Sequence, residues 1–120
     1  MDSVTLEVLV AAAIPRGIAG SDLLDKVRHA SEISALPASR PNLLRVYRRR
    51  LKHTGGDLEL LRLTEELVDF LAAYAHDELV MIEVSGRNGY HTFLLADRES
   101  SEILHWMRMF GEWNRAPGNQ

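Results

Sequence analysis

Hydrophobic residues recur at helical spacing over much of the chain, and capping or breaking residues bound each run. Residues 4–14 are almost wholly apolar. The three consecutive alanines in this run, and a capping residue at Asp2 or Ser3, favour a helix. The β-branched residues of the same run leave a strand as the alternative.

A second amphipathic run follows a turn rich in glycine. Ser21 or Asp22 can cap a helix whose apolar residues continue at helical spacing to about Ser34. The segment 36–41 contains two prolines and predicts a loop.

Two further helices are predicted in the middle of the chain. The first covers about residues 42–53 and ends at a pair of glycines. The second begins after Asp57 and reaches His76 with a wide apolar stripe, which makes it the most regular pattern in the sequence.

The pattern then changes to one typical of strands. Residues 78–85 and 90–96 are rich in β-branched and large apolar side chains, and Gly86 to Gly89 lie between them, so we predict a β-hairpin. Asp97 would cap a last helix to about Trp113. The predicted fold is therefore α+β, mainly helical with about four to five helices, with one C-terminal β-hairpin followed by a closing helix. Residues 1–113 would form a single globular domain and 114–120 a flexible tail.

Composition narrows the classes of protein without identifying one. The hydrophobic fraction of 46% and the charged fraction of 26% are ordinary for a globular domain. The absence of cysteine excludes disulfides, zinc–thiolate sites and cysteine nucleophiles, and it suits a reducing compartment. The longest apolar run is far shorter than the roughly 20 residues of a membrane helix, and the amino terminus lacks a basic signal region. We therefore expect a cytoplasmic protein without a membrane partner.

The charge pattern supplies the main functional signal. Although the net charge is -3, residues 40–52 carry six positive charges and no negative one. These residues are Arg40, Arg45, Arg48, Arg49, Arg50 and Lys52. On a helical wheel, four of them form a continuous stripe opposite the apolar side: Arg45, Arg48, Arg49 and Lys52.

Three interpretations of this stripe remain open. It could contact nucleic-acid phosphates, bind a protein or another anion, or simply be a solvated face. A helix-turn-helix fits poorly because the connection through Pro37 and Pro41 is longer than the usual turn. A winged helix fits poorly as well, since a long helix separates the stripe from the hairpin.

The sequence gives no support for catalysis. It contains no Gly-x-Ser-x-Gly elbow, phosphate-binding loop or dinucleotide fingerprint. Glu102 and His105 have the i, i+3 spacing of some helical metal sites, but the further glutamates of such a site are missing. We expect no catalytic residue, no metal and no cofactor.

Two features point to association with other molecules. Trp106, Phe110 and Trp113 are four and three residues apart, and they would form either part of the core or an interface. A lone hairpin leaves strand edges that the amino-terminal segment or a second copy could cover. We therefore expect a small non-enzymatic regulatory or adaptor protein that acts through protein–protein binding, as a homodimer. The alternative is a nucleic-acid-binding transcriptional regulator that uses the basic helix 42–53.

Overall fold

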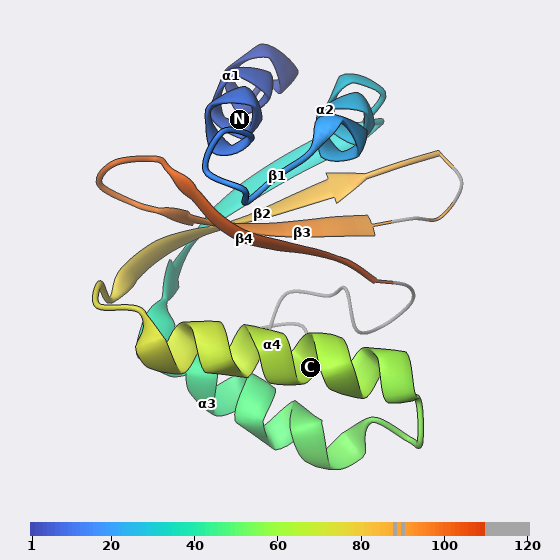
Figure 1. The fold of residues 1–120 in the computed structure, drawn as a ribbon, viewed down its shortest axis with the longest axis vertical. Coiled ribbons are helices and arrows are strands. Elements are labelled where there is room, and N and C mark those ends of the chain that lie inside the picture. Colours follow the sequence, from blue (N-terminus) through green and yellow to red (C-terminus); the bar gives the residue numbers. More distant parts are fainter. Residues whose placement is uncertain (88, 90, 110–120) are drawn as a thin grey trace.

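The computed structural model of the chain describes residues 1–87, 89 and 91–109. Its central feature is a four-stranded antiparallel sheet with a pair of helices on each face (Figure 1). In chain order the elements are α1 (Ser3–Ala13), α2 (Ser21–Arg28), β1 (Glu32–Ser39), α3 (Arg40–Arg50), the 3₁₀ helix η1 (Leu51–His53), α4 (Leu58–Ala73), β2 (Glu78–Ser85), β3 (His91–Asp97) and β4 (Ile103–Met109).

The strands lie in the order β1-β2-β3-β4, so each strand pairs with the next one along the chain. The strands β2, β3 and β4 form a meander, whereas α3 and α4 separate β1 from β2. In the β1–β2 pair, Leu36 lies opposite Met81 and Pro37 lies opposite Val80. Proline is tolerated there because β1 is an edge strand of the sheet.

The sheet divides the core into two hydrophobic clusters. On one face, α1 and α2 pack against the sheet through buried residues that include Leu6, Val27 and Leu94. On the other face, α3 and α4 pack through residues that include Tyr47 and Phe93. The central strands are therefore covered on both faces, which explains their nearly continuous apolar sequences.

The predicted fold class is wrong in its architecture. The chain is α+β, but it has a four-stranded sheet in place of a single C-terminal hairpin, and no helix closes the described part of the chain. The segment predicted as the closing helix contains β4, and Asp97 ends β3. The antiparallel pairing predicted for residues 78–85 and 90–96 does occur, as β2 with β3, within this larger sheet.

Other boundaries differ as well. The second helix ends at Arg28, and the segment expected to finish it and form a loop is β1. The helix predicted for residues 4–14 is confirmed as α1, with the Asp2 carboxylate accepting from the Thr5 backbone N–H at 2.7 Å. The long helix after Asp57 is confirmed as α4.

The structure removes the original reason for expecting a shared sheet. The two edges of the β2–β3 hairpin are covered by β1 and β4, from the same chain. Within the described residues, no helix has both the length and the apolar character needed to cross a bilayer. The predicted tail, residues 114–120, lies outside the described part of the chain.

Candidate functional site

The outer side of α3 and η1 carries the basic stripe that the sequence predicts, with Lys52 in η1 and the three arginines in α3. The side chains of Arg45, Arg48, Arg49 and Lys52 are exposed, and Tyr47 on the opposite side is buried. Arg45 donates to Asn42 Oδ1 at 3.1 Å. Among the described residues, the other three cations of the stripe form no hydrogen bond or ion pair.

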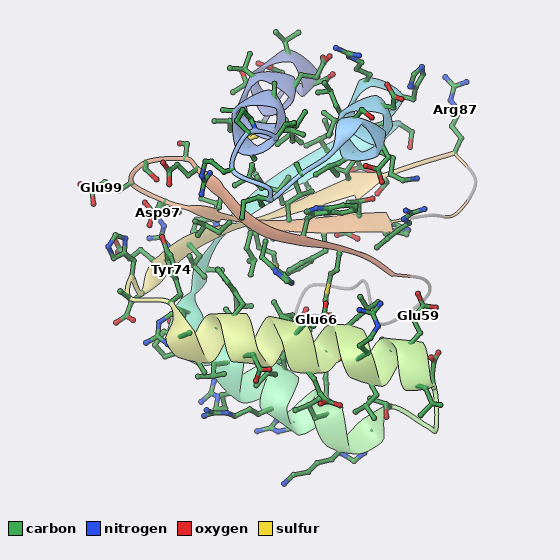
Figure 2. The ribbon with its side chains drawn as sticks, in the orientation of Figure 1. Glu59, Glu66, Tyr74, Arg87, Asp97 and Glu99 are labelled. Carbon is green, nitrogen blue, oxygen red and sulfur yellow. The ribbon has the colours of Figure 1, made fainter. Side chains whose placement is uncertain are left out.

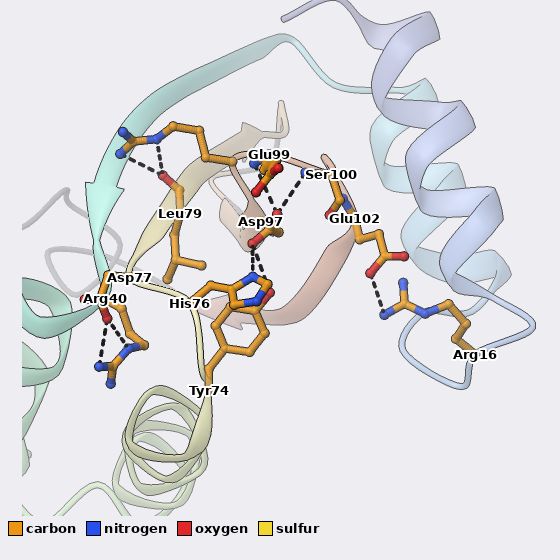
Figure 3. A network of polar contacts seen from close by, with 11 residues as sticks. Arg16, Arg40, Tyr74, His76, Asp77, Leu79, Asp97, Glu99, Ser100 and Glu102 are labelled. Atoms are coloured by element: carbon orange, nitrogen blue, oxygen red, sulfur yellow. Dashed lines mark hydrogen bonds and ion pairs between the residues drawn. The ribbon is translucent and has the colours of Figure 1, made fainter.

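Arg40 has a different role from the stripe. Its guanidinium forms an ion pair with Asp77 at 2.9 Å (Figure 3). It also donates to the Leu71 carbonyl at 2.8 Å, near the end of α4. Arg40 therefore ties the start of α3 to the segment that leads into β2. The sequence showed its charge but not this partner, which lies far along the chain.

Arg50 also belongs to the packed side of α3. It is only 5% exposed, and its guanidinium carbon lies 4.9 Å from the centroid of the Tyr47 ring. Arginine over an aromatic face is a favourable cation–π arrangement. The helical wheel contained this signal, because Arg50 follows Leu43 by seven residues and Tyr47 by three.

The neighbouring helix α4 has the opposite charge. Its exposed side carries four acidic residues and one arginine: Glu59, Glu65, Glu66, Asp69 and Arg62. Figure 2 shows Glu59 and Glu66 along this helix. Arg62 forms an ion pair with Glu66 at 2.7 Å within the helix. Among the described residues, no ion pair joins α4 to the basic stripe. Because α3 and α4 pack side by side (Figure 1), this layer presents a basic helix beside an acidic one.

A second polar cluster surrounds Asp97 at the end of β3 (Figure 3). One carboxylate oxygen accepts from the Tyr74 hydroxyl at 3.1 Å and from His76 Nδ1 at 3.0 Å. The other accepts from the backbone N–H groups of Glu99 and Ser100, at 3.1 and 2.8 Å. The Ser100 N–H and His76 contribute most to holding the pKa of Asp97 well below its usual value.

The Asp97 cluster stabilises a turn. Its backbone contacts close the connection between β3 and β4, where Ser101 adopts a positive φ of 65°. The hydrogen bond from His76 to the same carboxylate links this turn to the segment that follows α4. Sequence reasoning placed Asp97 at a helix start and so missed this cluster.

Trp106 is part of the packed core. It lies on β4 and is half-buried, and its Nε1 donates to the Ile18 carbonyl at 2.8 Å. It packs against the cluster beneath α1 and α2. The other two aromatic residues of the predicted interface, Phe110 and Trp113, lie outside the described residues.

The candidate metal ligands do not come together. Glu102 forms a long ion pair with Arg16 at 3.7 Å, while the His105 ring stacks on Phe70 with 5.3 Å between centroids. In the described part of the chain, no three histidine or acidic side chains are grouped closely enough to hold a metal ion.

Comparisons of this chain with protein-family models, with curated proteins and with solved structures find no match. The chemistry of the surface is therefore the basis for a functional interpretation. The α3–α4 layer presents a charged surface with a basic side and an acidic side.

Proposed function

We propose that the protein is a small non-enzymatic regulatory or adaptor protein that acts by protein–protein binding through the outer surface of α3 and α4. The supporting observation is the exposed basic stripe of Arg45, Arg48, Arg49 and Lys52 beside the acidic side of α4. Exposed charges that form no ion pair between the two helices are available to a partner whose charges have the complementary pattern.

The acidic helix favours a protein partner over nucleic acid. A duplex that approached the stripe would also meet the carboxylates of α4, and these repel phosphates. A protein partner can present acidic groups to α3 and basic groups to α4. The transcriptional regulator remains the alternative, supported by the arginine stripe alone, because phosphate contacts need only exposed cations.

A second copy of the chain has the required pattern. In a two-fold symmetric dimer the same surface of both copies is used. An arrangement with α3 of one copy against α4 of the other would pair basic with acidic residues twice. We therefore propose that the protein acts as a homodimer through this layer.

Charge reversal tests this proposal by sedimentation velocity at micromolar concentration. Arg48→Glu/Arg49→Glu makes α3 acidic, and Glu65→Arg/Asp69→Arg makes α4 basic. Each variant alone should be monomeric, because like charges then meet twice. An equimolar mixture of the two should form a heterodimer, because opposite charges meet again on both sides.

The controls separate the partner classes. Arg87→Gln/Arg108→Gln removes two exposed arginines elsewhere and should dimerise like the wild type. A wild-type protein that is monomeric at about 50 and 200 mM salt would contradict the homodimer. Fluorescence anisotropy with labelled duplex DNA tests the alternative. Since the stripe has four exposed cations, neutralising about four phosphates predicts a log–log salt slope of roughly -3.6.

A further inference from the structure

A pocket lies on the other face of the sheet, between α2 and the ends of β2, β3 and β4. It has a volume of about 560 Å³, within the range of roughly 300–1,000 Å³ that is usual for small-molecule sites. Three cross-strand neighbours line it, namely Val84, Thr92 and Arg108. One side of α2 and the start of the hairpin turn complete the lining through Asp22, Asp25, Lys26, His29, Gly86 and Arg87.

We infer that this pocket binds a small polar molecule that carries a phosphate or carboxylate group together with hydroxyl or amino groups. Neither the site nor its test depends on the proposed function, because the basic stripe lies on the helical layer at the opposite face of the sheet (Figure 1).

Two arginines of the pocket have guanidinium groups available for an oxyanion. Both Arg87 and Arg108 are exposed, and among the described residues neither forms an ion pair or a hydrogen bond. Arg87 lies at the tip of the β2–β3 hairpin (Figure 2). On the same side of the sheet, Arg28 forms an ion pair with Glu7 at 2.8 Å. Guanidinium groups recognise phosphates and carboxylates with paired N–H donors, so unpaired arginines at a pocket favour such a ligand.

Thr92 adds a hydroxyl group to the pocket. The residue is only 2% exposed, and its hydroxyl forms no hydrogen bond with the other described residues. The oxygen is not one of the fully buried polar atoms without a partner, so it is open to the pocket. It can therefore bind a ligand oxygen next to its cross-strand neighbour Arg108.

The acidic residues of α2 define the rest of the ligand. Asp22 and Asp25 also line the pocket, and within the described part of the chain the Asp25 carboxylate has only a long contact with Arg28 at 3.8 Å. Carboxylates accept hydrogen bonds from hydroxyl or ammonium groups but repel a second anionic group. The pocket therefore favours a molecule with an anionic end and a hydrogen-donating end over a simple polyanion.

An NMR titration tests the inference, with inorganic phosphate and lactate, which carries one carboxylate and one hydroxyl, as separate probes and with ionic strength kept constant by chloride. Backbone amide signals of Gly86, Arg87, Thr92 and Arg108 should shift and saturate with at least one probe. The probe that binds more tightly identifies phosphate or carboxylate as the preferred group. The amide spectrum also shows whether each variant is folded.

Three variants make the assignment specific. Arg87→Gln/Arg108→Gln should weaken binding by roughly tenfold or more. Thr92→Val, which keeps the shape of the side chain, should weaken it by a smaller factor. Arg45→Gln/Arg48→Gln removes the same charge from α3 and should leave the affinity unchanged.

Two results would overturn the inference. One is the absence of saturable shifts with either probe up to about 20 mM. That concentration is well above the dissociation constant of about 1 mM expected for an isolated anion. The other is an equal loss of affinity in the α3 variant and the pocket variant, because that would indicate attraction to overall positive charge alone.

Discussion

The Asp97 carboxylate is the centre of the polar cluster at the end of β3 (Figure 3). It accepts from the Tyr74 hydroxyl, from His76 and from two backbone N–H groups, and the residue is only 4% exposed. These contacts favour the ionised carboxylate, so its pKa in the folded protein lies below the usual value of 3.8. Its contribution to stability is therefore complete above that pH and decreases as the pH falls below it.

We expect Asp97→Asn to lower the melting temperature clearly at neutral pH. The asparagine amide cannot accept hydrogen bonds at both terminal atoms, so at least one side of the turn loses its partner. Circular dichroism melts at several pH values should show the difference from the wild type shrinking as the pH falls below 3.8.

Asp77→Asn is the matched control for this prediction. Its carboxylate forms an ion pair with Arg40, but the side chain is 65% exposed, so solvent screening limits the contribution of the pair. Equal losses in the two variants would show that Asp97 acts as an ordinary surface charge.

His105 also makes stability depend on pH, in the same direction as Asp97 but at higher pH. Its Nε2 is buried without a hydrogen-bond partner among the described residues, and burial lowers the pKa of the ring although Glu66 acts in the other direction. Since the folded protein resists protonation of this ring, stability falls as the pH drops below the usual value of 6.5.

His105→Phe should therefore raise the free energy of unfolding by about 1 kcal/mol at neutral pH. The new ring can stack on Phe70 as the imidazole does, and it leaves no buried nitrogen unpaired. Denaturant unfolding at about pH 7 and pH 5 should show the larger gain at the lower pH. The exposed His53, changed to Gln, should show neither effect.

At the scale of elements, β3 and β1 differ in burial although they belong to one sheet. Leu94 of β3 is completely buried, whereas Leu36 of β1 is 51% exposed. We expect Leu94→Ala to cost about 2–5 kcal/mol, since a cavity remains between helices and sheet. The same change at Leu36 should cost less than about 0.5 kcal/mol in the same unfolding assay. Similar losses at both positions would contradict the two-sided burial of β3.

The sequence predicted β4 as a helix for a physical reason. Ile103 and Trp106 are three residues apart, yet both pack on the α1–α2 face, because the pairing with β3 shifts register between Leu95 and Ala96. Met107 packs on the other face. A bulge within a strand covered on both faces therefore produced the i, i+3, i+4 pattern of an amphipathic helix.

The strand β1 was missed because its signals are weak locally. Prolines and serines suggested a loop, and only Ile33 and Ala35 pack as partly buried residues on the α1–α2 face. Its strand conformation depends on pairing with β2, which lies beyond two helices in the sequence. Periodicity within a short window cannot report such a partner.

At the scale of the whole molecule, the candidate surfaces differ in how far the sequence could predict them. The basic stripe is a property of one helix, so the helical wheel placed Arg45, Arg48 and Arg49 correctly on an exposed side. The helical wheel could not show that Arg40 is already paired within the chain, because its ion pair with Asp77 depends on the tertiary fold. The pocket was out of reach because α2 and three strands contribute to it together.

The connection from β1 to β2 also has a consequence for folding and aggregation. The strands β2, β3 and β4 are consecutive and can pair through short connections, whereas pairing of β1 with β2 closes a long loop that contains α3 and α4. We therefore expect β1 to pair last. Until then, β2 presents an unpaired edge with the apolar sequence 79–82. In the native sheet that edge is covered by a strand that contains Pro37 and offers other chains a poor template. We therefore expect protection from intermolecular β-pairing to be complete only after β1 has paired with β2.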